Sequence, residues 1–200
     1  MRFYFVRHAD KEDGNFLNPR LSQQDQPISK HGRTQAERLC QYFERKAITA
    51  SYVSEYVRTQ QTIRPLARRM RLTPVIDSRL NEVDRGELDR LSDEQIQEAY
   101  PATWEAYRER TEDFRWPGGE TGTEAQARIV SFLTERAYSP GDKLAVAHEG
   151  IIRLLLCYVL DIPVYRRFIF HLGTTGIVEI TQGTDRTGWG VVRLNQELTW

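Results

Sequence analysis

Cysteine and long apolar runs are what this sequence most clearly lacks. Only Cys40 and Cys157 occur among its 200 residues. Both fall in helical apolar patterns, which is typical of buried free thiols in a reducing compartment rather than of a disulfide framework. The longest apolar stretch, Leu154 to Leu160, is far shorter than the roughly 18 residues of a membrane span. Because the start of the chain also lacks the pattern of a secretory signal, we expect a cytoplasmic protein without a membrane partner.

Net charge is absent too, since 28 basic side chains balance 28 acidic ones. Without an overall positive field, no nucleic-acid partner is expected. Arginine outnumbers lysine by 24 to 4, and one helical stretch carries a run of arginines: Arg64, Arg68, Arg69 and Arg71. This run is typical of a solvated helix face. No His-x-x-x-His or Cys-x-x-Cys spacing occurs, so the sequence predicts neither a metal site nor a cofactor.

Short apolar segments alternate with helical patterns along the chain. Strands are predicted at 3–6, 50–54, 73–76 and 143–147, with a closing hairpin at 176–180 and 190–194. Strands that alternate with helices indicate an α/β fold, and we expect a single domain (residues 1–200) of three layers, α/β/α, around a mostly parallel central sheet. Residues from about 82 to 119 interrupt the alternation and are predicted to form a small helical cap. Pro65 predicts a kink in its helix, or a helix start later than Arg58.

Chemically active side chains follow several of the predicted strands. His8 comes directly after Arg7 at the end of the first strand, and His148 ends the strand at 143–147. Arg58 and Glu82 each lie shortly after another strand. Ligands bind outside the carboxyl ends of the strands in open α/β sheets, so these side chains are expected to converge. Guanidinium groups bind phosphate, an imidazole can attack phosphorus, and a carboxyl group can protonate a leaving oxygen.

Six segments in order resemble the histidine phosphatases, also called the phosphoglycerate mutase-like superfamily. They are Arg7-His8-Ala9-Asp10, the stretch from Pro27 to Ala36, the stretch from Val53 to Thr62, Leu80-Asn81-Glu82, the stretch from Pro117 to Thr121, and Ala147-His148-Glu149-Gly150. The first resembles the Arg-His-Gly signature of the family, and the third its Ser-x-x-x-Arg-x-x-Gln-Thr pattern. Each match alone is weak, but six in the correct order cover nearly the whole chain.

The resemblance implies a metal-independent phosphomonoesterase that acts on a small phosphate ester. His8 would be the nucleophile that becomes phosphorylated, while Arg7, Arg58 and His148 hold the phosphoryl group. Glu82 would be the general acid and then the general base. His8 must be neutral to attack, and its other ring nitrogen should donate to a backbone carbonyl. Backbone N–H groups after His148, at a helix N-terminus, are expected to stabilise the bound anion.

Three positions depart from the family pattern. Ala9 replaces the usual glycine, and Gly14 stands where many relatives have an asparagine that contacts phosphate. Asn15, one residue later, is the candidate to serve instead. Glu149 replaces a common glycine after His148, so its side chain must point away from the phosphate or repel it. Its candidate partners are a cationic part of the substrate and Arg153.

The cap segment contains four aromatic residues that could roof the pocket or simply pack onto the sheet: Trp104, Tyr107, Phe114 and Trp116. We favour the roof, because the cap should overhang the site.

Two other functions stay open. Phosphoglycerate mutases of the family share the catalytic core, but they generally have a longer segment after the general acid, and the span from Glu82 to Pro117 is short. A non-catalytic relative that binds a phosphorylated ligand or a partner protein is the alternative of a different class. The sequence leaves the oligomeric state open, with a homodimer as one possibility.

Overall fold

A computed structural model describes residues 1–183 and 187–198 of the chain. The strands are β1 (Arg2–Arg7), β2 (Leu17–Asn18), β3 (Gln23–Gln24), β4 (Ile48–Val53), β5 (Val75–Ile76), β6 (Asp142–Ala147), β7 (Ile177–Gln182) and β8 (Trp189–Gln196). The helices are α1 (Lys30–Phe43), α2 (Val57–Met70), α3 (Asp93–Ala99), α4 (Pro101–Glu109), α5 (Gly122–Ala137) and α6 (Glu149–Val159). Short 3₁₀ turns are η1 (Ser78–Leu80), η2 (Gly86–Arg90) and η3 (Val164–Ile169).

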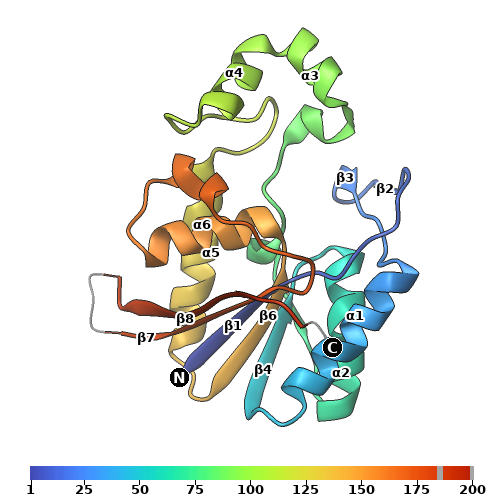
Figure 1. Cartoon of the computed structure of the whole chain (residues 1–200), viewed down its shortest axis with the longest axis vertical. Coiled ribbons are helices and arrows are strands. Elements are labelled where there is room, and N and C mark those ends of the chain that lie inside the picture. Colours follow the sequence, from blue (N-terminus) through green and yellow to red (C-terminus); the bar gives the residue numbers. More distant parts are fainter. Residues whose placement is uncertain (184–186, 199–200) are drawn as a thin grey trace.

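The central sheet has six strands in the order β5-β4-β6-β1-β7-β8 (Figure 1). Strand β1 pairs in parallel with β6, and β4 pairs in parallel with both β5 and β6. The last two strands form an antiparallel hairpin against β1. The predicted α/β fold with a mostly parallel sheet is therefore confirmed.

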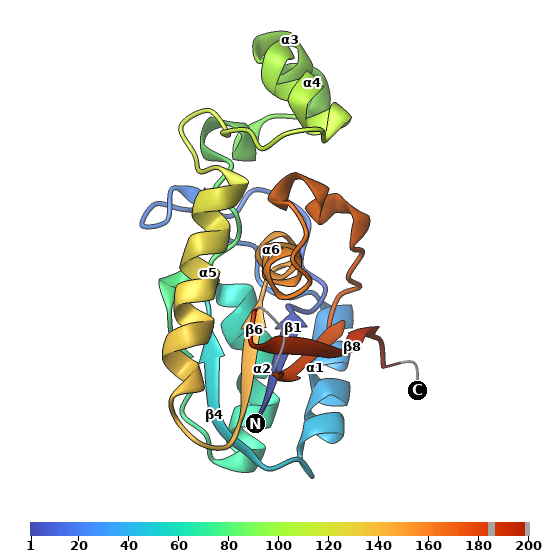
Figure 2. The ribbon, with the colours of Figure 1, turned by 90° about the vertical axis from the view of Figure 1, so that its left-hand side faces the viewer.

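Helices cover both faces of the sheet because β1 is apolar on both sides. Phe3 and Phe5 point to one face, where they join the core formed by α5 and α6. Tyr4 and Val6 point to the other face and pack with α1 and α2. This alternation of side chains follows from the two-residue period of a strand. Figure 2 shows the three layers, with α5 and α1 on opposite sides of the strands.

Helix α2 corrects the prediction made from Pro65. The helix begins at Val57, so it includes Arg58 and runs through Pro65; the predicted later start is wrong. Its buried face, which includes Ile63 and Leu66, packs into the core of the sheet. Burial of these side chains offsets the one backbone hydrogen bond that a proline removes.

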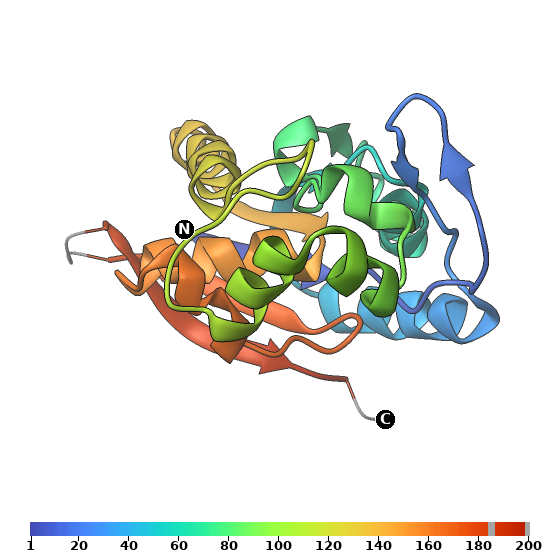
Figure 3. The same ribbon diagram turned by 90° about the horizontal axis from the view of Figure 1, so that it is seen from above.

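The cap contains η2, α3 and α4 and lies beyond one end of the sheet (Figures 1 and 3). Helix α3 begins with a capping box, in which Ser92 and Gln95 bond to each other's backbone N–H groups. A separate small apolar cluster centres on Leu88, Ile96 and Trp116. No helix in the described part of the chain is long and apolar enough to cross a membrane.

Candidate active site

His8 lies just past the end of β1 and is almost fully buried. Its backbone N–H donates to the carbonyl of Ala147 on β6 (2.9 Å), which fixes the end of β1 beside the end of β6. The ring nitrogen Nδ1 lies 2.8 Å from the carbonyl oxygen of Ala9. A carbonyl can only accept, so Nδ1 carries the proton and Nε2 keeps its lone pair. This is the contact that the sequence analysis expected for a nucleophilic histidine.

His148 precedes α6 at the end of the neighbouring strand β6, and its ring centroid is 5.3 Å from that of His8. Its Nε2 lies 2.8 Å from the hydroxyl oxygen of Ser54, which itself accepts a hydrogen bond from the N–H of Tyr56. The other ring nitrogen, Nδ1, is buried and has no partner among the described residues. When the hydroxyl of Ser54 donates to Nε2, Nδ1 carries the proton and is a free donor.

Both imidazoles are held neutral. Burial, reinforced by the charge of Arg58, lowers the pKa of His8 to about 3. Burial also lowers the pKa of His148 well below its ordinary value, with further contributions from Arg58 and His8. The His8 ring is therefore neutral at physiological pH, which is the form of an imidazole that has a lone pair available for nucleophilic attack.

Two arginines lie beside the histidines. Arg7 donates to the carbonyl of Leu172 (2.5 Å) and pairs with Glu149 at 3.1 Å. Arg58 is buried at the start of α2, with its guanidinium 4.2 Å from the centre of the Tyr56 ring and 3.9 Å from Asp25. The Nε atom of each arginine is buried without a partner among the described residues. Both guanidiniums therefore keep donor capacity for an anion.

Glu82 occupies the N-terminus of α6. Its carboxylate accepts hydrogen bonds from the backbone N–H groups of Val83 (2.9 Å), Gly150 (3.2 Å) and Ile151 (3.1 Å). The close approach needs a glycine, because a Cβ on Gly150 would lie 2.6 Å from Oε1 of Glu82. We had expected these helix N–H groups to face the bound anion. The N–H groups of Gly150 and Ile151 instead bind the carboxylate of Glu82, which is itself the candidate acid, so for these two the expectation is wrong.

Arg128 on α5 fixes the loop that carries Glu82, and the sequence analysis missed it. Its guanidinium donates to the backbone carbonyls of Arg79 and Asn81 (both 2.8 Å) and of Glu82 (3.1 Å). An ion pair with Glu120 (2.6 Å) holds the guanidinium in place.

These groups meet at a cavity of about 290 Å³ near the carboxyl ends of β1 and β6. Four of the predicted site residues line it: Arg7, His8, Arg58 and Glu82. His148 is fully buried against the ring of His8. Among the described residues, no group of three or more His, Cys, Asp or Glu side chains is placed to hold a metal ion.

The family assignment rests on a match over nearly the whole chain. The sequence model of the histidine phosphatase superfamily (branch 1) matches residues 3–197. The chain belongs to the histidine phosphatase superfamily. The expectation of a phosphatase of the histidine phosphatase type is therefore confirmed at the level of the family.

Relatives within the superfamily have different names. A probable phosphoglycerate mutase GpmB of Enterobacter sp. (strain 638) is 28% identical over 182 residues, which cover 90% of this chain and 84% of that protein. Phosphoserine phosphatase 1 of Hydrogenobacter thermophilus is 23% identical, with 98% and 88% covered. Among solved structures, a mycobacterial glucosyl-3-phosphoglycerate phosphatase has the same fold, with a TM-score of 0.82, 24% identity, and 98% and 99% of the two chains covered.

The departures from the histidine phosphatase pattern have distinct structural outcomes. Asn15 is exposed, accepts a hydrogen bond from the side chain of Gln24 (2.9 Å) and lines a neighbouring hollow rather than the His8 cavity. This geometry does not support Asn15 as a phosphate ligand. The residues that the β1–α1 loop does bring to the cavity are Lys11, Gln24 and Gln26, none of which the sequence analysis selected.

Glu149 points to its arginine partners, as expected. It pairs with Arg153 at 2.5 Å and with Arg7 at 3.1 Å, and it accepts a hydrogen bond from the N–H of Leu172. Its charge is thus neutralised from two sides. The carboxylate acts as an anchor for Arg7 beside the histidine phosphatase site.

Aromatic side chains of the cap divide into two groups. Tyr107 and Trp116 line the cavity, together with Phe168 from η3, which the sequence analysis did not identify. Trp104 and Phe114 pack behind them in the cap cluster. The roof predicted for the pocket is therefore provided by two of the four aromatic residues.

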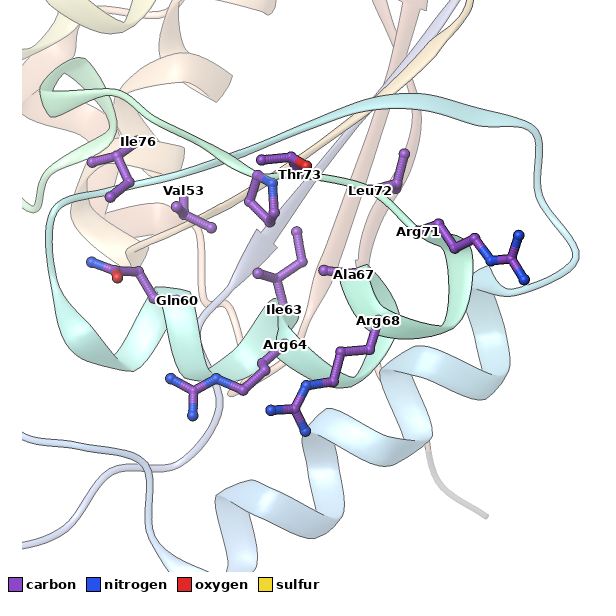
Figure 4. Close-up of a pocket in the computed structure, with 11 residues that line it drawn as sticks. Val53, Gln60, Ile63, Arg64, Ala67, Arg68, Arg71, Leu72, Thr73 and Ile76 are labelled. Atoms are coloured by element: carbon purple, nitrogen blue, oxygen red, sulfur yellow. The ribbon is translucent and has the colours of Figure 1, made fainter.

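The arginine run on α2 lies elsewhere. Arg64, Arg68 and Arg71 rim a groove of about 500 Å³ between α2 and the edge strand β5 (Figure 4). The floor of this groove is apolar, with Ile63 and Ala67, and its lining contains no histidine or carboxylate. All the arginines of the run are exposed, as expected of a solvated face.

Proposed function

We propose that this protein is a metal-independent phosphomonoesterase that works through a phosphohistidine at His8. The observation that carries the proposal is the neutral His8 ring, whose Nδ1–H is held by the carbonyl of Ala9 while Nε2 keeps its lone pair next to two guanidiniums. Such a nitrogen can attack an electrophilic phosphorus without first losing a proton.

In the first step, Nε2 of His8 forms a bond to phosphorus and the bond from phosphorus to the ester oxygen breaks. Arg7 and Arg58 bind the equatorial oxygens, and the free Nδ1–H of His148 donates to the same group. These donors neutralise the charge of the phosphoryl group in the transition state, which is the main requirement of phosphoryl transfer. They supply the positive charge that a metal ion would otherwise provide.

Glu82 acts as the general acid in the first step and as the general base in the second. Oε1 accepts from Val83 and Ile151, whereas Oε2 accepts only the longer bond from Gly150, so Oε2 is the oxygen left to carry a proton. Oε2 protonates the leaving oxygen in the first step. It then takes a proton from the water that attacks the phosphohistidine, after which the bond from Nε2 to phosphorus breaks and inorganic phosphate leaves.

The test is turnover of p-nitrophenyl phosphate in excess EDTA. We expect wild-type activity to survive EDTA and the His8→Ala variant to lose it by about 10⁴-fold or more, as for other removed nucleophiles. His31→Ala is the matched control, because His31 is an exposed residue on the first turn of α1. Loss of activity in EDTA, or unchanged activity in His8→Ala, contradicts the proposal.

A mutase is the second candidate, because some relatives are named as probable phosphoglycerate mutases. A mutase would return the phosphoryl group from His8 to its substrate before water attacks. Interconversion of 3- and 2-phosphoglycerate that is faster than phosphate release would favour it over the phosphatase. A non-catalytic phospho-ligand-binding or partner-binding relative is disfavoured by the neutral His8 and the complete set of partners around it.

A further inference from the structure

The cavity holds more positive charge than its own carboxylates neutralise. Six cationic side chains line it: Arg7, Lys11, Arg58, Arg85, Arg153 and Arg167. Four of these form an ion pair with a carboxylate of the chain: Arg7 and Arg153 with Glu149, Arg58 with Asp25, and Arg167 with Asp113. Lys11 and Arg85 have no carboxylate within 4.0 Å among the described residues. These two cations are the ones that the chain leaves for a ligand.

Lys11 is held at the cavity by a buried amide. Its Nζ donates to Oε1 of Gln26 (3.1 Å), and the Gln26 amide in turn donates to the carbonyl of Gly14 (3.3 Å). Both Lys11 and Gln26 line the cavity. Asp89, on the cavity wall, attracts Lys11 only from beyond ion-pair distance and receives the N–H of Gln24. The ammonium is thus directed by a neutral group, and its charge is still available to an anion.

Arg85 reaches the cavity from the cap side. Its guanidinium carbon lies 5.1 Å from the centre of the Trp116 ring, and its Nε is buried with no hydrogen-bond partner in the part of the chain that the structure describes. The turn that carries it is fixed, because Gly86 has a φ of +54° and a Cβ there would lie 2.2 Å from the carbonyl oxygen of Pro117. A stacked arginine on a rigid turn keeps its edge free for a planar or tetrahedral anion.

We propose that Lys11 and Arg85 form a subsite for a second anionic group of the substrate. The substrate class is then a small phosphate ester that carries, besides the phosphate, a carboxylate or another phosphate. This inference rests on the proposed function, in which Arg7 and Arg58 are committed to the phosphoryl group. A cavity of about 290 Å³ limits such a substrate to a small molecule.

Matched ester pairs test the subsite. Glycerol 3-phosphate differs from 3-phosphoglycerate, and phenyl phosphate from 4-carboxyphenyl phosphate, essentially by the carboxylate. For at least one pair, we expect wild-type kcat/KM to be about tenfold or more higher for the carboxylated ester, since a hydrogen bond to a charged group typically has that effect. Lys11→Met and Arg85→Met should each reduce this preference about tenfold, while the parent ester falls by no more than about threefold.

Two controls accompany these variants. Lys11→Arg keeps the positive charge and should retain most of the preference. Arg90→Met removes an exposed arginine of the same η2 turn that does not line the cavity, and it should leave both esters unchanged.

Equal losses for both members of a pair would overturn the subsite, because Lys11 and Arg85 would then serve the phosphoryl group itself. Absence of any wild-type preference in both pairs would overturn it as well. The proposed function is judged separately, by turnover of p-nitrophenyl phosphate. If wild-type protein turns over none of the four esters, calorimetric binding to His8→Ala protein decides the subsite. Tighter binding of the carboxylated esters supports the subsite, and equal binding contradicts it.

Discussion

The floor of the cavity contains Arg7, His8 and Arg58, with His148 buried behind His8, and it is built on the central sheet and α2. The roof contains Arg85, Tyr107 and Trp116 and belongs to the cap. The floor is fixed by strand pairing and by burial in the main cores. The roof rests on a small aromatic cluster and on polar contacts. Gln23 donates to Asp84 (2.6 Å), and the N–H of Gln24 donates to Asp89 (2.9 Å), tying the β2–β3 ribbon to the cap.

This difference indicates a division of labour. The rigid floor presents the groups that phosphoryl transfer needs at fixed positions, as preorganised catalysis requires. In the proposed function, the roof would contact the group that is esterified to the phosphate. Changes in the floor and at Glu82 should therefore alter kcat, and changes in the roof should alter KM and substrate preference.

After removal of the nucleophile, the largest effect is expected at Glu82, the candidate acid. Glu82→Gln keeps the size of the side chain but removes the proton that the leaving oxygen needs. Esters with poor leaving groups, such as alkyl phosphates, should lose about 10²- to 10³-fold in kcat, the usual contribution of general acid catalysis. p-Nitrophenyl phosphate, whose leaving group needs no proton, should lose much less. Equal losses for both classes of ester would show that Glu82 is not the acid.

A smaller loss is expected at Ser54, which positions His148. Ser54→Ala removes the hydroxyl that lies 2.8 Å from Nε2 and therefore the hydrogen-bond partner of that ring nitrogen. We expect kcat to fall about tenfold with little change in KM, because one buried hydrogen bond contributes roughly 1 kcal/mol. Ser51→Ala is the control, since the hydroxyl of Ser51 is buried on β4 and has no hydrogen-bond partner within residues 1–183 and 187–198. Equal losses in the two variants would contradict this role.

Substitutions in the roof should change KM rather than kcat. Tyr107→Leu removes an aromatic ring that lines the cavity. The centroid of this ring lies 5.4 Å from that of the Phe168 ring. The KM for aryl phosphates should rise about three- to tenfold, in line with a lost aromatic contact, while kcat and inhibition by inorganic phosphate stay constant. Tyr138→Leu changes a highly exposed tyrosine on the surface and serves as the control. A fall in kcat without a change in KM would break the division between floor and roof.

No change at all is expected in the charge of His8 over mildly acidic pH. Burial and Arg58 lower its pKa from 6.5 to about 3. Because lowering the pKa moves protonation to lower pH, the ring should remain neutral from pH 7 down to about pH 4. Nitrogen-15 NMR of the His8 ring checks this directly. Titration near pH 6.5 would contradict a nucleophile that is prepared in advance.

The sequence predicted the floor better than the roof. Arg7, His8, Arg58 and His148 stand at or near the ends of strands, and strand pairing in a largely parallel sheet brings such ends together whatever the details of packing. The helix start at Val57 was not predicted because Pro65 disfavours a helix through its local effect on the backbone. The burial of the helix face, which outweighs that effect, depends on tertiary contacts that the local sequence does not reveal. Ser54 and Arg128 were missed for the same reason, since their partners lie far away in the chain.

The helix N-terminus after His148 also shows that a long-range contact can change the role of a correctly located group. Its N–H groups were expected to stabilise the bound anion, but Gly150 lets the carboxylate of Glu82 reach two of them instead. Likewise, the choice between Asn15 and Lys11 depends on which way a polar loop turns, and no spacing in the sequence specifies that. The motifs located the candidate site residues, whereas long-range contacts determined which of their polar groups remain available to a ligand.

Trapping of the covalent intermediate tests the central claim most directly. Protein mixed with a phosphorus-32-labelled ester, quenched within milliseconds in base and digested, should yield one labelled peptide that contains His8, with a phosphoryl bond that is stable in base and labile in acid. His8→Ala protein should give no label, and His31→Ala protein should give as much as wild type. Label on any other residue, or turnover of the ester without label at His8, would contradict the account.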